Sequence, residues 1–148
     1  MALLNYTTTI DPEQTISEIQ RMLSKYGISA MMTEYDGPHV ASVSFQIRIN
    51  EKPIAFKMPC NWRAVLVVFN EQGIGTSKIK HKDKNTNNQA IRTAWRIIKV
   101  WIEAQLALVE VNMVTIPQIF LPYAITRDGR TLAEKIEEDP GFLLGPAS

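Results

Sequence analysis

The sequence has one cysteine, two histidines and no fully apolar run longer than six residues, and each shortage excludes a class of protein. A single thiol, Cys60, cannot form an intrachain disulfide, which favours a reducing compartment over secretion. The two widely spaced histidines, His39 and His81, cannot supply a metal site by themselves. The longest apolar run, residues 64–69, is far shorter than a membrane span. The N-terminal residues also lack the basic stretch of a signal peptide. We therefore expect a cytoplasmic protein with no metal site and no membrane segment.

The sequence also lacks the short motifs that hold phosphates or activate water. It contains no Walker-type glycine loop, no GxGxxG and no HExxH, and residues 73–75 are consistent only with a turn. Cys60 has no histidine beside it in the sequence, so we interpret it as a small buried hydrophobic residue. We interpret an acidic cluster near the C-terminus as a solvated helix face. Its members are Glu134, Glu137, Glu138 and Asp139. The sequence predicts no cofactor and no catalytic residue.

What is present is the composition of one ordinary globular domain. Hydrophobic residues make up 45% of the 148 residues and charged residues 21%, which is too apolar for a disordered chain and sufficient for a core. No internal repeat and no linker divides the chain. We expect a single domain over residues 1–148. Within it, residues 139–148 form a tail, and Phe142, Leu143 and Leu144 could dock it.

The first two elements are predicted by residue type and by helix punctuation. Residues 3–10 are rich in threonine and tyrosine, which indicates a short strand. Asp11 is a good N-cap, Pro12 suits the first helical position, and apolar residues follow at helical spacing. Gly27 is suited to ending that helix. We therefore expect a helix over residues 12–26.

The middle of the chain predicts a meander of strands, and the rest predicts helices. Alternating polar and apolar residues indicate strands over 28–37, 40–49 and 54–58. Thr86 and Gln89 form a capping-box pattern that opens the longest helix. The remaining elements are helices over 62–71, 87–111 and 131–138, and a short helical turn with an extended piece over 115–125. Three valines within 62–71 leave a buried strand open as the alternative there. The order β-α-β-β-β-α-α predicts an α+β fold, an antiparallel sheet with helices on one face.

The formal net charge of +1 hides an uneven distribution along the chain. Residues 1–77 carry −1, residues 78–100 carry +6, and residues 101–148 carry −4. In the middle part seven cations stand against one acid, Asp83. The seven are Lys78, Lys80, Lys82, Lys84, Arg92, Arg96 and Lys99.

This basic segment has a pattern that suits phosphate binding. Its four lysines alternate, so an extended loop would present them on one side. Arg92, Arg96 and Lys99 follow at helical spacing, so the positive surface would continue along the next helix, whose N-terminus adds N–H donors. Arg48 and Lys57, on the polar face of the sheet, would support it. That face also carries Ser42, Ser44 and Gln46. The alternatives are an ordinary solvated surface, or a basic segment that faces the acidic third of a second subunit.

The longest helix is apolar on more than one side. Trp95 fits its core stripe, whereas Trp101 lies at the border of a second apolar face with Val100 and Leu108. A helix that is apolar nearly all round is a buried one. Two segments could bury the second apolar face. One is a second subunit, so we expect a homo-oligomer, and the other is the segment IFLPY over residues 119–123 of the same chain.

Three stretches of the sequence are similar to a known group of proteins. YTTTIDPEQTISEIQRMLSKYG, AWRIIKVWIEAQLALVE and IFLPYAITRDGRTL resemble a family of small, mostly uncharacterised phage and prophage proteins. The resemblance covers roughly residues 6–132, and its most specific part is the helix run 94–110. It implies a bacterial host and supplies no catalytic residues. The predicted core order also looks like that of phage single-strand annealing proteins, which implies an oligomer that holds single-stranded DNA in a basic groove.

Three hypotheses of function follow from these observations. The first is a phage-type nucleic-acid-binding protein that binds or anneals single-stranded DNA in recombination through the basic loop and helix face. The second is a phage accessory or anti-defence protein that binds a host protein or sequesters a nucleotide. The third is a metal-dependent nuclease, whose ligands would be scattered in the sequence. Binding under the first hypothesis should weaken steeply with salt. Saturation by a dinucleotide-sized ligand, with no dependence on strand length, would favour the second.

Overall fold

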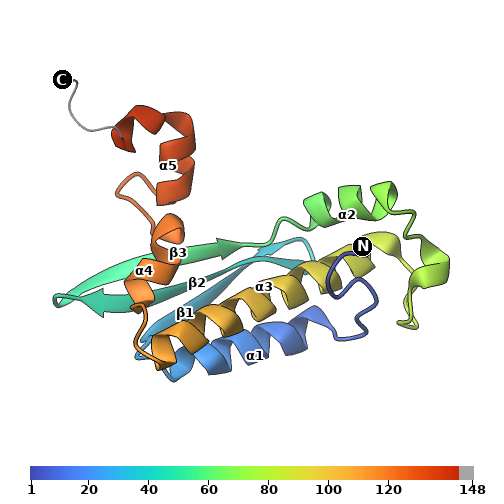
Figure 1. Ribbon diagram of the computed structural model, residues 1–148, viewed down its shortest axis with the longest axis horizontal. Coiled ribbons are helices and arrows are strands. Elements are labelled where there is room, and N and C mark those ends of the chain that lie inside the picture. Colours follow the sequence, from blue (N-terminus) through green and yellow to red (C-terminus); the bar gives the residue numbers. More distant parts are fainter. Residues whose placement is uncertain (144–148) are drawn as a thin grey trace.

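The computed structural model describes residues 1–143 and confirms the α+β fold (Figure 1). The three strands are β1 (Ala30–Asp36), β2 (His39–Ile49) and β3 (Lys52–Pro59). The helices are α1 (Pro12–Ser24), α2 (Trp62–Glu71), α3 (Thr86–Glu110), α4 (Ile116–Phe120) and α5 (Leu132–Glu138). The 3₁₀ turns are η1 (Thr76–Lys78), η2 (Leu121–Tyr123) and η3 (Pro140–Leu143).

The meander and the two helices that flank it confirm the predictions made from local pattern. The strands pair antiparallel in the order β1-β2-β3, and every strand is where alternation indicated. Residues 62–71 are a helix and not a strand. Asn61 caps that helix, with its Oδ1 accepting from the Ala64 N–H. A side-chain acceptor at this position satisfies one of the unpaired N–H groups of a first helical turn, and the cap therefore favours the helix.

Two helices cover one face of the sheet. In Figure 1, α1 and α3 lie side by side across it, α2 packs against the first half of α3, and α4 lies near β3 at the other end. The aromatic centre of the core joins the sheet to α4. Phe45 and Phe56 face each other across β2 and β3 with ring centroids 5.4 Å apart, and Phe120 meets Phe45 edge-on at 5.0 Å. Such pairs add about 0.5–1.5 kcal/mol to the burial of their surfaces.

The expected strand over residues 3–10 is wrong. These residues form turns, and Asn5 adopts a left-handed backbone with φ of 60°. Their carbonyl oxygens are taken by α3: Gln89 Nε2 donates to Tyr6 O and to Thr8 O, both at 3.0 Å, and Thr93 Oγ1 donates to Asn5 O at 3.2 Å. A segment anchored to helix side chains needs no strand partner, and tertiary contacts here override β propensity.

Helix α3 begins and packs slightly differently from the prediction. The N-cap is Asn85, whose side chain accepts from the Asn88 N–H, and the expected capping box at Thr86 and Gln89 is not formed. Trp95 is fully buried, as predicted. Trp101 meets Phe120 and Tyr123 edge-on, so the 119–123 segment covers it within the monomer. No helix among the described residues has both the length and the apolar character needed to span a membrane.

The C-terminal part confirms a short last helix. Thr131 caps α5 and forms a capping box with Glu134. The first residues of the expected tail form η3, where Leu143 is exposed. Leu144 and the side chain of Phe142 lie outside the described part of the chain, so the expected docking patch is not described.

Candidate nucleic-acid interface

The loop over residues 78–84, called the basic loop below, turns its lysines outward. Lys78, Lys80, Lys82 and Lys84 are all exposed. The three residues between them turn toward the protein: Ile79 is buried, and His81 and Asp83 are partly buried. The loop is therefore anchored through every second residue, as the alternation indicated, although Lys78 itself belongs to the 3₁₀ turn η1.

The anchoring residues hold the loop through specific hydrogen bonds. The Asp83 N–H donates to His81 Nδ1, and His81 Nε2 lies 2.9 Å from Asp11 Oδ1 at the start of α1. With Nδ1 as an acceptor, the ring carries its proton on Nε2, which donates to the carboxylate. The Asn85 N–H and the Asn88 side chain donate to Asp83, and with Arg92 they lower the pKa of that carboxyl. The backbone of the loop is thus fixed against both α1 and α3.

The lysines themselves keep their charges available. Within residues 1–143, no carboxylate lies within 4 Å of any of the four ammonium groups. Lys84 Nζ donates to the Ile79 carbonyl at 2.7 Å, a neutral acceptor that leaves its charge uncompensated. Four cations within seven residues repel one another, and an anion bound among them relieves that repulsion.

Arg92 is not part of an exposed positive surface, which corrects the expectation. Its side chain is 3% exposed and lies between two segments of the chain. Nε and Nη2 donate to Gln89 Oε1 at 3.0 and 2.6 Å, and Nη2 also donates to the Asp83 carbonyl at 3.2 Å. Because Gln89 holds the N-terminal segment and Asp83 belongs to the basic loop, Arg92 connects the two.

The other two helix cations are also paired within the molecule. Arg96 forms an ion pair with Glu18 of α1, and Lys99 pairs with Glu103 one helical turn further along α3. Burial alone would raise the pKa of Glu18, but the hydrogen bond and charge of Arg96 outweigh it and lower that pKa. Both cations have side chains less than one-fifth exposed. The expected continuation of the positive surface along the helix is therefore wrong.

The supporting cations on the sheet do not join the loop either. Lys57 on β3 reaches over β2 to Glu34 on β1, with Nζ and Oε1 3.6 Å apart. Ser42 and Ser44, which lie beside this pair on the same face, are buried, whereas Gln46 further along β2 is exposed. Arg48 donates to the Glu51 carbonyl beside the β2–β3 turn. In Figure 1 that turn and the basic loop lie at opposite ends of the molecule.

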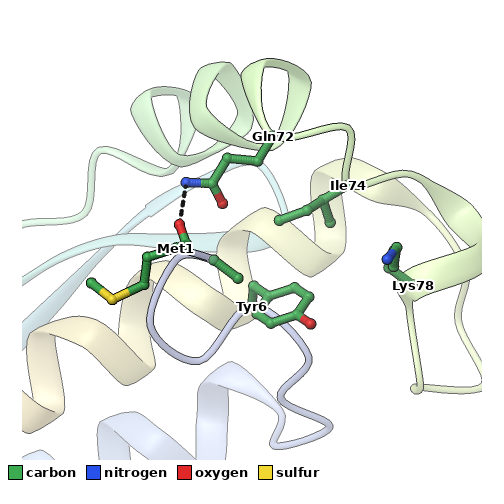
Figure 2. Close-up of a pocket in the computed structure, with 6 residues that line it drawn as sticks. Met1, Tyr6, Gln72, Ile74 and Lys78 are labelled. Carbon is green, nitrogen blue, oxygen red and sulfur yellow. Dashed lines mark hydrogen bonds between the residues drawn. The ribbon is translucent and has the colours of Figure 1, made fainter.

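A cavity of about 320 Å³ opens where the basic loop begins (Figure 2). It lies between the N-terminal residues and the connection from α2 to η1. Gln72 holds its wall: Oε1 accepts from the Leu3 N–H at 2.9 Å, and Nε2 donates to the Met1 carbonyl at 3.2 Å. The residues that line it are Met1, Ala2, Tyr6, Gln72, Ile74 and Lys78. The cavity thus combines an aromatic ring with the first cation of the loop.

Sequence reasoning missed Tyr6, Gln72 and Gln89 as parts of this region. The sequence pattern places Tyr6 in a strand and Gln89 in a helix cap. The signal in the sequence is three polar residues, Gln89, Arg92 and Thr93, among the apolar residues of 89–95 in the long helix. Polar residues inside a buried stripe bond to one another or to backbone; Gln89 and Arg92 bond to each other, and their other partners lie 9 to 83 residues away.

We searched the described residues for clusters of metal-ligating side chains and for a reactive thiol. Among residues 1–143, no three His, Cys, Asp or Glu side chains are positioned to share a metal ion. Cys60 is buried between β3 and α2, and burial raises the pKa of its thiol to about 12. A protonated, buried thiol is a poor nucleophile.

We expect Cys60 to resist thiol reagents in the folded protein. At pH 8 its reaction with a disulfide reagent should be at least about a hundredfold slower than in guanidinium chloride, because both the thiolate fraction and the access are low. The rate of absorbance change measures this. Stoichiometric reaction of the folded protein at the unfolded rate would contradict the buried placement.

Comparison of the chain with protein-family models, with curated proteins and with solved structures found no match.

Proposed function

We propose that the chain binds nucleic acid through the basic loop, with a preference for single strands and little selectivity for sequence. The observation that carries this proposal is the loop itself. Four exposed lysines lie within seven residues, none within 4 Å of a carboxylate in the described chain, on a backbone fixed by buried and partly buried side chains. A fixed backbone lowers the entropy lost when an anion binds.

The type of cation supports phosphate contact without base readout. Lysine ammonium groups act as point charges toward phosphates, whereas reading of base edges usually uses bidentate arginine, asparagine or glutamine side chains. The arginines nearest the loop, Arg92 and Arg96, are occupied by Gln89, Asp83 and Glu18. Contacts limited to phosphates position a strand but carry no sequence information.

Salt dependence of oligonucleotide binding tests the proposal. A fluorescently labelled 20-residue oligothymidine is titrated with the protein at 50, 100 and 200 mM salt. If the four lysines each neutralise one phosphate, log K falls against log salt with a slope of about −2.8, from about 0.7 per contact. Affinity then drops about fiftyfold between 50 and 200 mM.

Two outcomes would contradict this. If the protein does not bind the oligonucleotide at 50 mM salt, the proposed function is wrong. If it binds a duplex of the same length more tightly, the proposed preference for single strands is wrong. If binding saturates with a dinucleotide and does not change with strand length, the second hypothesis, sequestration of a nucleotide, replaces the first. A strand-annealing assay on the same samples tests the role in recombination that the phage resemblance implies.

The expected homo-oligomer stays a prediction. With Trp101 covered, the large exposed apolar residues on α3 and just after it are Val100, Leu108, Val111 and Met113, which are 38%, 36%, 61% and 72% exposed. A second copy that packed there would bury them. Measuring the mass in solution during the titration tests this expectation separately from binding.

A further inference from the structure

Resting on the proposed function, we propose that the cavity in Figure 2 holds one unstacked base of the bound strand. Tyr6 is the side chain on which the base stacks, and Lys78 contacts its phosphate. Lys78 lines the cavity and is also the first cation of the basic loop. A strand whose phosphates lie along Lys80 and Lys82 therefore reaches the cavity at Lys78.

The backbone of Tyr6 is held in place before any ligand arrives. Its carbonyl accepts from Gln89, which is fully buried and is itself fixed by Arg92. The ring packs against the small core cluster of Phe69, Ile74 and Ala90 and stays partly exposed. Within residues 1–143, its hydroxyl has no hydrogen-bond partner. An aromatic ring fixed in this way loses little conformational freedom when a base stacks on it.

The walls of the cavity suit any base and do not select one. The one side-chain amide that lines it belongs to Gln72, and both of its ends are bonded to the N-terminal backbone. Each end of that amide is thus already bonded once to the backbone, which fixes its orientation. Stacking on an aromatic face tolerates all bases, since each has a π-face. A cavity of about 320 Å³ is near the lower end of the range for small-molecule pockets, which fits a single base.

Two substitutions of Tyr6 separate the ring from its hydroxyl. Tyr6→Leu should weaken binding of the 20-residue oligonucleotide about 5- to 150-fold, the range found when stacking residues are removed. Tyr6→Phe should bind like the unchanged protein, because the ring remains. Tyr35→Leu is the matched control, as Tyr35 is an exposed tyrosine on β1 outside this cavity. Thermal unfolding midpoints check that each variant is folded.

A measurement on the unchanged protein keeps the proposal testable if Tyr6→Leu does not fold. An oligonucleotide with one 5-iodouracil is irradiated in the complex, and the crosslinked peptide is identified by mass spectrometry. We expect a crosslink to Tyr6. Crosslinks only to other aromatic residues, or a Tyr6→Leu variant that is folded and binds within twofold of the unchanged protein, would overturn the assignment of the cavity.

The failures of the two proposals differ. Suppose that the unchanged protein binds with the expected salt dependence, but Tyr6 does not crosslink and Tyr6→Leu binds with unchanged affinity. The cavity is then not a base site, and the proposed nucleic-acid binding stands. If no oligonucleotide binds but a 5-iodouracil mononucleotide crosslinks to Tyr6, the cavity is a nucleotide site and the polyanion function fails. If neither binds, both fail.

Discussion

The quadruple variant K78Q/K80Q/K82Q/K84Q should lose up to about 4,000-fold in affinity for a 20-residue oligothymidine at 50 mM salt. Each phosphate contact that releases a counterion contributes nearly a factor of ten at this salt concentration, and the variant removes up to four such contacts. The residual affinity of the variant should depend only weakly on salt concentration. Because all four side chains are exposed, the free energy of unfolding should change by less than about 1 kcal/mol.

A control of equal charge distinguishes a local site from the overall charge of the protein. The variant R21Q/K25Q/K52Q/R127Q removes four exposed cations from other elements, and none of the four forms an ion pair within residues 1–143. Screening limits their effect on a strand held at the basic loop, so we expect a loss of less than about tenfold. Equal losses in the two variants would show that binding follows net charge and that the basic loop is not a site.

Arg92→Met should lower the free energy of unfolding by about 2–4 kcal/mol. The substitution leaves Gln89 Oε1 without the two donors it has now, and Gln89 is fully buried. A buried polar group left unsatisfied costs about 1–3 kcal/mol. The Asp83 carbonyl loses one donor as well. Methionine retains part of the apolar packing of the arginine stem, so the loss reports mainly the hydrogen bonds.

The same variant should also loosen the two segments that Arg92 connects. We expect trypsin to cleave the basic loop of Arg92→Met faster than that of the unchanged protein under folding conditions, because Asp83 loses its support. Arg21→Met, an exposed arginine on α1, is the matched control and should change stability by less than about 0.5 kcal/mol. Urea denaturation of both variants gives the comparison. If Arg92→Met unfolds like Arg21→Met, the buried network does not stabilise the fold.

Much of the fold was predictable because its signals are local. Helix α1 follows from Pro12 and the apolar spacing behind it, and β2 follows from its strict alternation. The Asp11 side chain lies against His81 and forms no cap hydrogen bond, so the expected cap of α1 is not made. The N-terminal strand was predicted wrongly for the same reason. Threonine and tyrosine favour strands only on average, and here the backbone acceptors of the segment are bound by Gln89 and Thr93, more than 80 residues away.

Some features of the candidate site also follow from local sequence, whereas others depend on the tertiary structure. The position of the basic segment, the alternation of its lysines and the helix that follows it can be read from neighbouring residues, since charge and periodicity are local properties. Which cations stay available was decided by the tertiary fold. Arg92, Arg96 and Lys57 resemble the loop lysines in the sequence, yet each lies against an acceptor from another element, whereas the loop lysines do not. A charge is set by residue type, but its availability depends on what packs beside it.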